Sequence, residues 1–323
     1  MSDYVLELSG IRKTYRGGIE ALKGINLRVP QGCVYGLLGP NGAGKSTMVK
    51  ILTTLIRRSG GDGTMLGKPI GDRKTLQQVG LLPEHTQFPP YLTGRQVIEF
   101  AAGLQDVPSA LTKERADMLL KKVSMTDSQH RKIKTYSKGM KQRIGVAQAL
   151  VSNPKIIFLD EPTDGVDPAG RREFRSLVRE LRDEGRTIFI NTHILSELEP
   201  IVDRVAIMTN GKIVGEGKLD ELRTEKTGYV VGFEGQLSVE SRSKFLDGGL
   251  EVEGGTVRLP STNALDAQPV IDRIRKEGLV VTDLSLKSQS LEDLFIRLVG
   301  DPSSPPPPPL PANSAQPPKI PQA

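Results

Sequence analysis

The segment Val34–Thr47, with the sequence VYGLLGPNGAGKST, joins an apolar run to a glycine-rich stretch that ends in Lys45 and Ser46. It fits the pattern G-x-x-x-x-G-K-[ST], with its glycines at Gly39 and Gly44. In such a loop, backbone N–H groups approach phosphate oxygens, the lysine reaches the terminal phosphates, and the serine hydroxyl completes a Mg²⁺ shell. An expected strand before the loop and an expected helix after it favour a phosphate site over a plain glycine-rich turn.

Two adjacent acids, Asp160 and Glu161, follow the apolar run Ile156–Leu159, which predicts a strand buried on both faces. Residues at the carboxyl ends of parallel strands meet the ligand of an α/β sheet. We therefore expect Asp160 to hold Mg²⁺ through water, and Glu161 to orient or deprotonate an attacking water. The alternative is a solvated acidic turn, but the same chain already has a phosphate loop.

Three further side chains stand where they would meet a nucleotide. His193 directly follows the predicted strand Thr187–Asn191, where it can hydrogen-bond a γ-phosphate. Glu84 follows the predicted strand Val79–Leu82, where it can hold a Mg²⁺ water. Tyr15, ahead of the loop, can stack on adenine. Each also has an ordinary reading: a structural histidine, a surface glutamate and a half-exposed strand tyrosine.

The elements that position these residues alternate between strands and helices. Short strands are expected over Tyr4–Pro30, with a turn at 16–18, and apolar spacing predicts a helical insertion over Thr93–Leu150. The insertion contains the segment YSKGM, in which Ser137 precedes a helix predicted at Lys141–Val151. That helix start is either a second anion site or a simple cap.

Composition narrows the classes of protein that fit. The 323 residues suggest two domains, and the net charge of +6 includes no long basic block, so we expect no nucleic acid partner. Cys33 is the only cysteine, which excludes a disulfide framework and a cysteine zinc site. No apolar run reaches the roughly 18 residues of a spanning helix. We expect a protein that is soluble or held to a membrane by a partner.

The pattern changes beyond residue 222. Residues 223–300 predict the order βαββαβ, a small α+β domain of the ferredoxin-like kind, with a hairpin at Gly254–Gly255 and a last helix Leu291–Val299 capped by Ser290. Residues 301–323 contain the run Pro305–Pro309 and little that could form a core, so we expect a disordered or polyproline-like tail, as a spacer or as a ligand for a proline-binding module.

Taken together, residues 1–222 resemble the ATPase subunit of ATP-binding cassette (ABC) transporters. The resemblance implies an α/β fold with a P-loop NTPase (RecA-like) core, an antiparallel β subdomain and a helical subdomain. It implies ATP and Mg²⁺ as cofactors, Tyr15 on adenine, Asp160 on Mg²⁺, Glu161 as general base and His193 on the γ-phosphate. It assigns phosphate and Mg²⁺ to the loop residues Gly39, Pro40, Asn41, Gly42, Ala43, Gly44, Lys45, Ser46 and Thr47.

The resemblance also implies a second copy of the chain, facing the first head to tail. Ser137 and Gly139 of one copy would close over ATP held by the other, and Asp167 would be the acid of the loop that crosses the interface. Lys138 and Met140 depart from the usual LSGGQ, and Glu84 stands where glutamine is usual. Both departures, and the segment SLEDLFIRLVG near residue 300, look like those of type-2 exporter ATPases, which include antibiotic self-resistance pumps.

We therefore expect a cytoplasmic ATPase, peripheral on the inner face of the cell membrane, that powers a separate integral membrane permease. The expected cargo is a drug, a lipid or a polysaccharide-like molecule. The alternatives are a soluble ABC ATPase acting on nucleic acid or ribosomes, and an ATP-binding switch without turnover. The expected permease-docking surface is His85–Gly94 together with the helical insertion, with Arg95 at its exposed edge and Phe88 and Tyr91 either contacting the permease or packing under the insertion.

Overall fold

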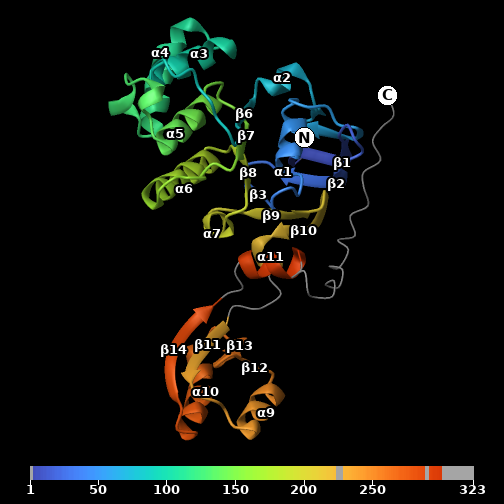
Figure 1. Cartoon of the computed structure of the whole chain (residues 1–323), viewed down its shortest axis with the longest axis vertical. Helices are drawn as coiled ribbons and strands as arrows, with labels where there is room; N and C mark the ends of the chain where they lie inside the picture. The colour runs from blue at the N-terminus through green and yellow to red at the C-terminus, as the bar shows by residue number, and fades with distance from the viewer. Residues whose placement is uncertain (1–2, 223–227, 288–290, 300–323) are drawn as a thin grey trace. The chain divides into compact units, whose positions relative to one another are not determined.

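A computed structural model describes residues 3–222, 228–287 and 291–299 (Figure 1). The chain divides into two compact units: the first covers residues up to Leu219 and from Phe295 onward, and the second covers Asp220–Leu294. The predicted cap Ser290 and the predicted tail from Asp301 lie outside the described residues. Among the described helices, none is both long enough and apolar enough to cross a bilayer.

A six-stranded sheet in the order β10-β9-β3-β8-β7-β6 forms the centre of the first unit. Every strand runs parallel to its neighbour except β10, which is antiparallel to β9. The strands β3, β7 and β8 are buried at every position, as expected for strands covered on both faces. The bounds are β3 (Val34–Leu38), β6 (Val79–Leu82), β7 (Ile156–Asp160), β8 (Thr187–Thr192), β9 (Arg204–Thr209) and β10 (Lys212–Lys218).

A four-stranded antiparallel sheet packs on the same core. Its order is β2-β1-β4-β5, with the bounds β1 (Tyr4–Thr14), β2 (Glu20–Pro30), β4 (Gly60–Met65) and β5 (Lys68–Pro69). One apolar cluster joins residues of β1 and β2, of α1 (Lys45–Leu52), and of β3, β7 and β8. Within it Tyr35 stacks on Phe189, with ring centroids 5.5 Å apart. This burial fixes the phosphate loop, which lies between β3 and α1.

The predicted helical insertion is present as α3 (Gly94–Leu104), α4 (Ser109–Lys122) and α5 (Lys138–Ala149). In Figure 1 these helices lie on the opposite side of the six-stranded sheet from β1 and β2. A capping box of Thr93 and Gln96 starts α3. The helix predicted from Lys141 begins three residues earlier because Ser137 is its N-cap, accepting a hydrogen bond from the Met140 N–H.

The remaining helices up to residue 222 are short, apart from α6. They are α2 (Arg73–Leu76), α6 (Pro168–Asp183), α7 (Leu195–Leu198) and α8 (Leu219–Leu222), and two 3-10 turns span Thr126–Ser128 and Ile133–Thr135. Helix α6 starts at the N-cap Asp167, whose side chain accepts a hydrogen bond from the Gly170 N–H. It follows β7 and precedes β8, so it is the crossover that makes these strands parallel.

The second unit has the predicted βαββαβ order. Its strands form a sheet in the order β12-β13-β11-β14, and every pair is antiparallel. This is the ferredoxin-like arrangement. Helices α9 and α10 share an apolar core with the sheet. The bounds are β11 (Gly228–Glu234), α9 (Val239–Asp247), β12 (Glu251–Glu253), β13 (Thr256–Leu259), α10 (Ala264–Lys276) and β14 (Val280–Lys287), followed by α11 (Leu291–Val299).

Candidate active site

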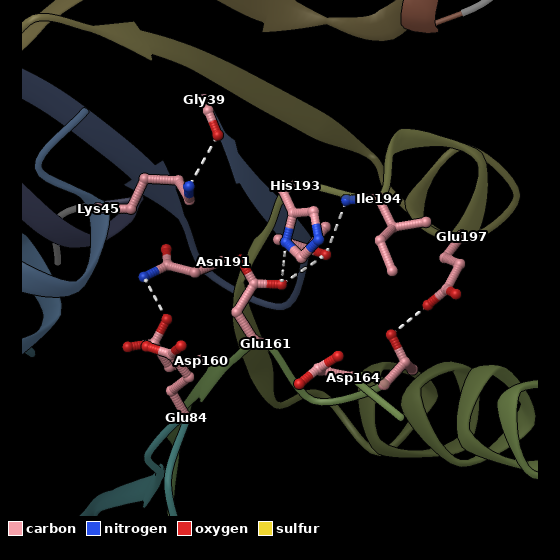
Figure 2. Close-up of polar contacts among 12 residues, drawn as sticks. Gly39, Lys45, Glu84, Asp160, Glu161, Asp164, Asn191, His193, Ile194 and Glu197 are labelled. Atoms are coloured by element: carbon pink, nitrogen blue, oxygen red, sulfur yellow. Dashed lines mark hydrogen bonds and ion pairs between the residues drawn. The ribbon is translucent and has the colours of Figure 1, made fainter. Parts of the chain in front are cut away.

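Four neighbouring parallel strands end at one edge of the six-stranded sheet, and each is followed by predicted site residues. The phosphate loop follows β3, His193 follows β8, Asp160 and Glu161 lie at the end of β7, and Glu84 follows β6. Because the strands are parallel, their carboxyl ends meet at one edge. Figure 2 shows Lys45, Glu84, Asp160, Glu161 and His193 gathered there.

The shape of the phosphate loop depends on two glycines. A Cβ at Gly39 would lie 2.3 Å from the backbone oxygen of Met208, so any larger residue would collide with β9. Gly44 is the N-cap of α1 and has a φ of 109°, which other residues rarely adopt. These two positions let the N-terminal N–H groups of α1 point into an open loop, where an anion would be favoured.

Lys45 is a buried cation at the start of α1. Its side chain is 6 % exposed, and its Nζ donates to the backbone oxygens of Gly39 at 2.7 Å and of Pro40 at 3.3 Å. Burial lowers the pKa of Lys45 below its ordinary value, and the charges of Glu161, Asp160 and Glu84 oppose that shift. An ammonium held by two neutral oxygens is a good partner for phosphate oxygens.

Asp160 accepts hydrogen bonds from one residue of α1 and one residue of β8. Its Oδ1 accepts from the Ser46 hydroxyl at 3.3 Å and from the Asn191 side-chain amide at 3.2 Å. Burial raises the pKa of Asp160, while these two hydrogen bonds act in the opposite direction. A hydroxyl and a carboxylate this close are oxygen donors of the kind that Mg²⁺ prefers, so the residues fit the ion.

Glu161 has a backbone conformation that is rare for a residue with a side chain. Its φ is 49°, and its N–H donates to the backbone oxygen of Asn191 at 2.9 Å. The Oε2 atom of its buried carboxylate accepts from the Thr192 hydroxyl at 3.1 Å and lies 2.9 Å from His193 Nδ1. Strained backbone of this kind persists where the surroundings fix it, commonly at active sites. The carboxylate therefore has a defined direction.

Tyr15 and Glu84 lie at the margins of the site. The Tyr15 hydroxyl is 3.3 Å from Thr47 Oγ1, so its ring is beside the phosphate loop, and the residue is exposed. Lys13 Nζ lies 5.1 Å from the centre of the ring. Glu84 is exposed and pairs with His85 at 3.8 Å. Both positions leave these side chains accessible to a ligand.

Ser137, Gly139 and Asp167 belong to a different part of the first unit. Ser137 and Gly139 are at the N-terminus of α5, and a Cβ at Gly139 would have only Ser137 Oγ nearby, at 4.0 Å. Asp167 accepts from the Gly170 N–H at 2.8 Å, which lowers the pKa of its carboxyl. These residues start helices and do not stand at the carboxyl ends of the strands.

Sequence reasoning missed the residues that support the acids. Asn191 and Thr192 are fully or almost fully buried at the end of β8, and they bind Asp160 and Glu161. Two polar residues that end an apolar strand, directly before His193, are a pattern that could have identified them. Glu197 on α7 is 7 % exposed and accepts from the buried Thr163 hydroxyl. No local pattern marks Glu197, because its partners are far away in the sequence.

Comparison with known proteins identifies the family. The ABC transporter family model matches residues 22–164. An uncharacterized ABC transporter ATP-binding protein of Nostoc sp. is 42 % identical over 304 residues, which cover 91 % of this chain and 90 % of that protein. The daunorubicin/doxorubicin resistance ATP-binding protein DrrA of Streptomyces peucetius is 33 % identical over 312 residues, covering 92 % of this chain and 93 % of DrrA.

Solved structures agree with this comparison. CbiO1 from Clostridium perfringens, described as part of the ABC transporter complex CbiONQ, has a TM-score of 0.62 and 32 % identity, covering 68 % of this chain and 91 % of CbiO1. The cassette MJ0796, solved as a dimer bound to ADP and Pi, has a TM-score of 0.62 and 27 % identity, covering 66 % of this chain and 98 % of that cassette. The chain belongs to the ATP-binding subunits of ABC transporters, whose ATPase activity is coupled to transport.

Proposed function

We propose that the chain hydrolyses MgATP as one half of a head-to-tail homodimer and powers a separate membrane permease. We further propose export of a drug, lipid or polysaccharide-like cargo, since relatives named for daunorubicin resistance span nearly the whole chain. The observation that supports hydrolysis best is the Glu161 carboxylate. Thr192 and His193 hold it at the sheet edge shared with Lys45 and Asp160.

In this proposal each residue has a separate task. The loop amides and Lys45 bind the β and γ phosphates, and Ser46, Asp160 and Glu84 hold Mg²⁺ directly or through water. When bound, Mg²⁺ would offset the negative charge that builds on the phosphates. Glu161 accepts a proton from the attacking water. His193 contacts Glu161 through Nδ1 at 2.9 Å, and its Nε2 would meet the γ-phosphate.

In this proposal the second copy supplies further contacts to the ATP bound at the strand edge of the first. Ser137 and Gly139 stand at a helix N-terminus with open space beside the glycine, which suits a phosphate brought by another molecule. Asp167 would then cross the interface, and Tyr15 would stack on the adenine. The related cassette MJ0796 has been solved as a dimer. This supports a dimer of the present chain as well.

The partner would be an integral membrane permease, with the chain peripheral on the cytoplasmic face of the membrane. CbiO1 is described as part of a transporter complex, which supports such a partner. Exposed apolar side chains lie in and beside the predicted docking segment: Tyr91 is 69 % exposed, Phe100 60 % and Leu104 69 %. Of the two aromatic residues of this segment, Phe88 is half-buried and Tyr91 is the more exposed.

Arg95 does not form the exposed edge that its sequence position suggests. Its side chain is 20 % exposed and bonds Glu99 at 2.9 Å and Asp117 at 2.6 Å, with Gln129 at 2.7 Å. A charge reversal at Arg95 would therefore disrupt the contact of α3 with α4 and would not test docking. The docking test has to use Tyr91, Phe100 and Leu104 instead.

The test of hydrolysis is Glu161→Gln. The variant should bind ATP normally, turn over more slowly by a factor on the order of 10² to 10⁴, and accumulate as an ATP-bound dimer. Lys45→Ala is the matched variant that should lose ATP binding in calorimetry, because phosphate charge is then unopposed. Wild-type turnover in Glu161→Gln, or a strict monomer by light scattering with ATP and Mg²⁺, would contradict the mechanism.

A further inference from the structure

Lys138 makes a contact that its position in the helix does not explain. Its Nζ pairs with Asp164 Oδ2 at 2.6 Å. Its stem lies across Gly165, where a Cβ would be 2.6 Å from Lys138 Cδ and 2.8 Å from Nζ. Gly165 also has a φ of 69°, which favours glycine. Both the close approach of Lys138 and the backbone conformation therefore disfavour a side chain at this position. The lysine therefore lies flat against the chain that follows Glu161.

Two effects disfavour the position of the Lys138 ammonium against the protein, and the contact with Asp164 opposes both. Lys138 is the first residue of α5, where the helix dipole disfavours a positive charge. Its side chain is also 59 % exposed, so water could solvate it away from the protein. The contact with Asp164 offsets both, and the hydrogen bond from Lys138, followed by its charge, lowers the pKa of Asp164.

The Lys138–Asp164 pair joins the start of α5 to the segment between β7 and α6, and both of these contain predicted site residues. Lys138 stands between Ser137 and Gly139 at the start of α5, in the helical insertion. Asp164 stands between Glu161, at the end of β7, and Asp167, the N-cap of α6. Figure 2 places Asp164 on the segment that leaves Glu161. Through this pair the helical insertion is tied to the strand edge within a single chain.

We propose that Lys138 is a positioning residue, which clamps the segment 161–167 against the N-terminus of α5 and so keeps Glu161 and Asp167 in register with Ser137 and Gly139. The proposal rests on the function proposed above. The described contacts of Lys138 are with Asp164 and Gly165 and not with the phosphate loop of its own chain, so the clamp acts on turnover and not on ATP binding by that loop. Loss of the clamp lets Glu161 and Asp167 move relative to α5.

The kinetic test uses Lys138→Met, which keeps the stem and removes the charge, together with Asp164→Asn. Each should lower kcat by about 3- to 10-fold with an unchanged KM for ATP, since small displacements of a catalytic group are costly. The double variant should be no worse than either single one, because both remove one interaction. Lys138→Arg should keep most of the activity.

Lys244→Met is the matched control. Lys244 pairs with Glu240 at 2.5 Å, its side chain is 51 % exposed, and it lies in the second unit. This variant should keep both kcat and KM. A drop in kcat for Lys138→Met without one for Asp164→Asn would overturn the clamp and point to a direct role of the lysine. Additive effects or a raised KM would also overturn it.

A second measurement separates the clamp from the proposed function. Amide hydrogen exchange over residues 161–167, measured on the nucleotide-free chain, should be faster in Lys138→Met and Asp164→Asn than in the wild type or Lys244→Met. If the wild type hydrolyses no ATP, the proposed function fails, while this exchange difference still supports the clamp. Unchanged exchange in both variants would refute the clamp even in an active ATPase.

Discussion

At the scale of single residues, burial disfavours the charge on both groups that would meet MgATP. The ammonium of Lys45 and the carboxyl of Asp160 are each shifted toward their neutral forms by loss of water. Phosphate oxygens would stabilise the lysine charge, and a divalent cation would stabilise the aspartate charge. The site is therefore better suited to the complex of ATP with Mg²⁺ than to either one alone.

Cys33 gives a prediction about pH. Burial, followed by the nearby charge of Asp203, raises the pKa of this thiol from 9.0 to about 12. The unfolded chain loses the thiol proton near pH 9 and the folded chain does not, so stability falls as pH rises through this window. The expected loss is about 1.4 kcal/mol per pH unit. Urea unfolding at pH 8, 9 and 10 measures it.

The comparison variant for this measurement is Cys33→Ala. It leaves a small cavity, whose cost does not depend on pH, and it removes the titrating group. Between pH 9 and 10 its free energy of unfolding should decline less steeply than that of the wild type. Other buried groups are present in both proteins, and the raised pKa of Tyr35 is due first to burial, with the charge of Cys33 as its smallest cause. Parallel pH profiles of the two proteins would show that the Cys33 thiol does not have the raised pKa.

The sequence located the residues at the strand ends because their order and spacing are local. Lys45 follows Gly44, the two acids follow one apolar run, and His193 follows another. The structure brings these residues to one edge. The residues that aim them were not predictable in the same way. Thr192 binds Glu161 across 31 residues, and such a contact depends on which strands are neighbours in the sheet.

At the scale of elements, a buried carboxylate connects the chain after β7 to α7. Glu197 accepts from the Thr163 hydroxyl and lies 2.5 Å from Arg171 Nη1 on α6. Arg171 also donates to the backbone oxygen of Val166 at 2.8 Å. Since α7 directly follows His193, this contact links the segment after Glu161 with the segment after His193.

Glu197→Ala should therefore destabilise the first unit. The change leaves the buried Thr163 hydroxyl without a partner and opens a cavity, at a cost of about 2 kcal/mol. For a unit of this size that is a fall of roughly 4 to 8 °C in Tm. Differential scanning calorimetry gives the shift.

Glu180→Ala is the control: Glu180 pairs with Lys122 at 2.8 Å but is 58 % exposed, so its loss should change Tm by about 2 °C or less. Equal shifts in the two variants would contradict the role assigned to Glu197.

Element bounds were predictable where a local feature sets them. The apolar run Val79–Leu82 predicts β6 to the residue, and the last predicted helix, Leu291–Val299, is α11 with the same bounds. The helical insertion was predicted only as a region, which does not locate the start of α4 at Ser109. Its N-cap is Pro108, which makes no side-chain cap, and its first turn is weakly apolar, so neither pattern marks the beginning.

At the scale of the whole molecule, the fold of each unit was easier to predict from the sequence than the residues that each unit exposes. The family resemblance predicted the P-loop core and the βαββαβ pattern predicted a ferredoxin-like domain, because few topologies are compatible with either pattern. The sequence predicted the docking surface only as a region, His85–Gly94 with the helical insertion. Which apolar side chains of that region face outward depends on the fold, which exposes Tyr91, Phe100 and Leu104.

The last prediction concerns these three residues. Phe100 and Leu104 are four residues apart on α3 and so share one face of the helix, and exposed apolar faces on folded proteins commonly mark partner surfaces. The double variant Phe100→Ser/Leu104→Ser, alone and with Tyr91→Ala, should leave the ATPase rate of the isolated subunit within about twofold. Recovery of the co-expressed permease in a pull-down should fall by about tenfold, the effect of roughly 1.4 kcal/mol in binding.

Leu265→Ser, at a position 73 % exposed in the second unit, is the control and should keep full recovery. Normal recovery of the permease with the triple variant would place the docking surface elsewhere on the chain.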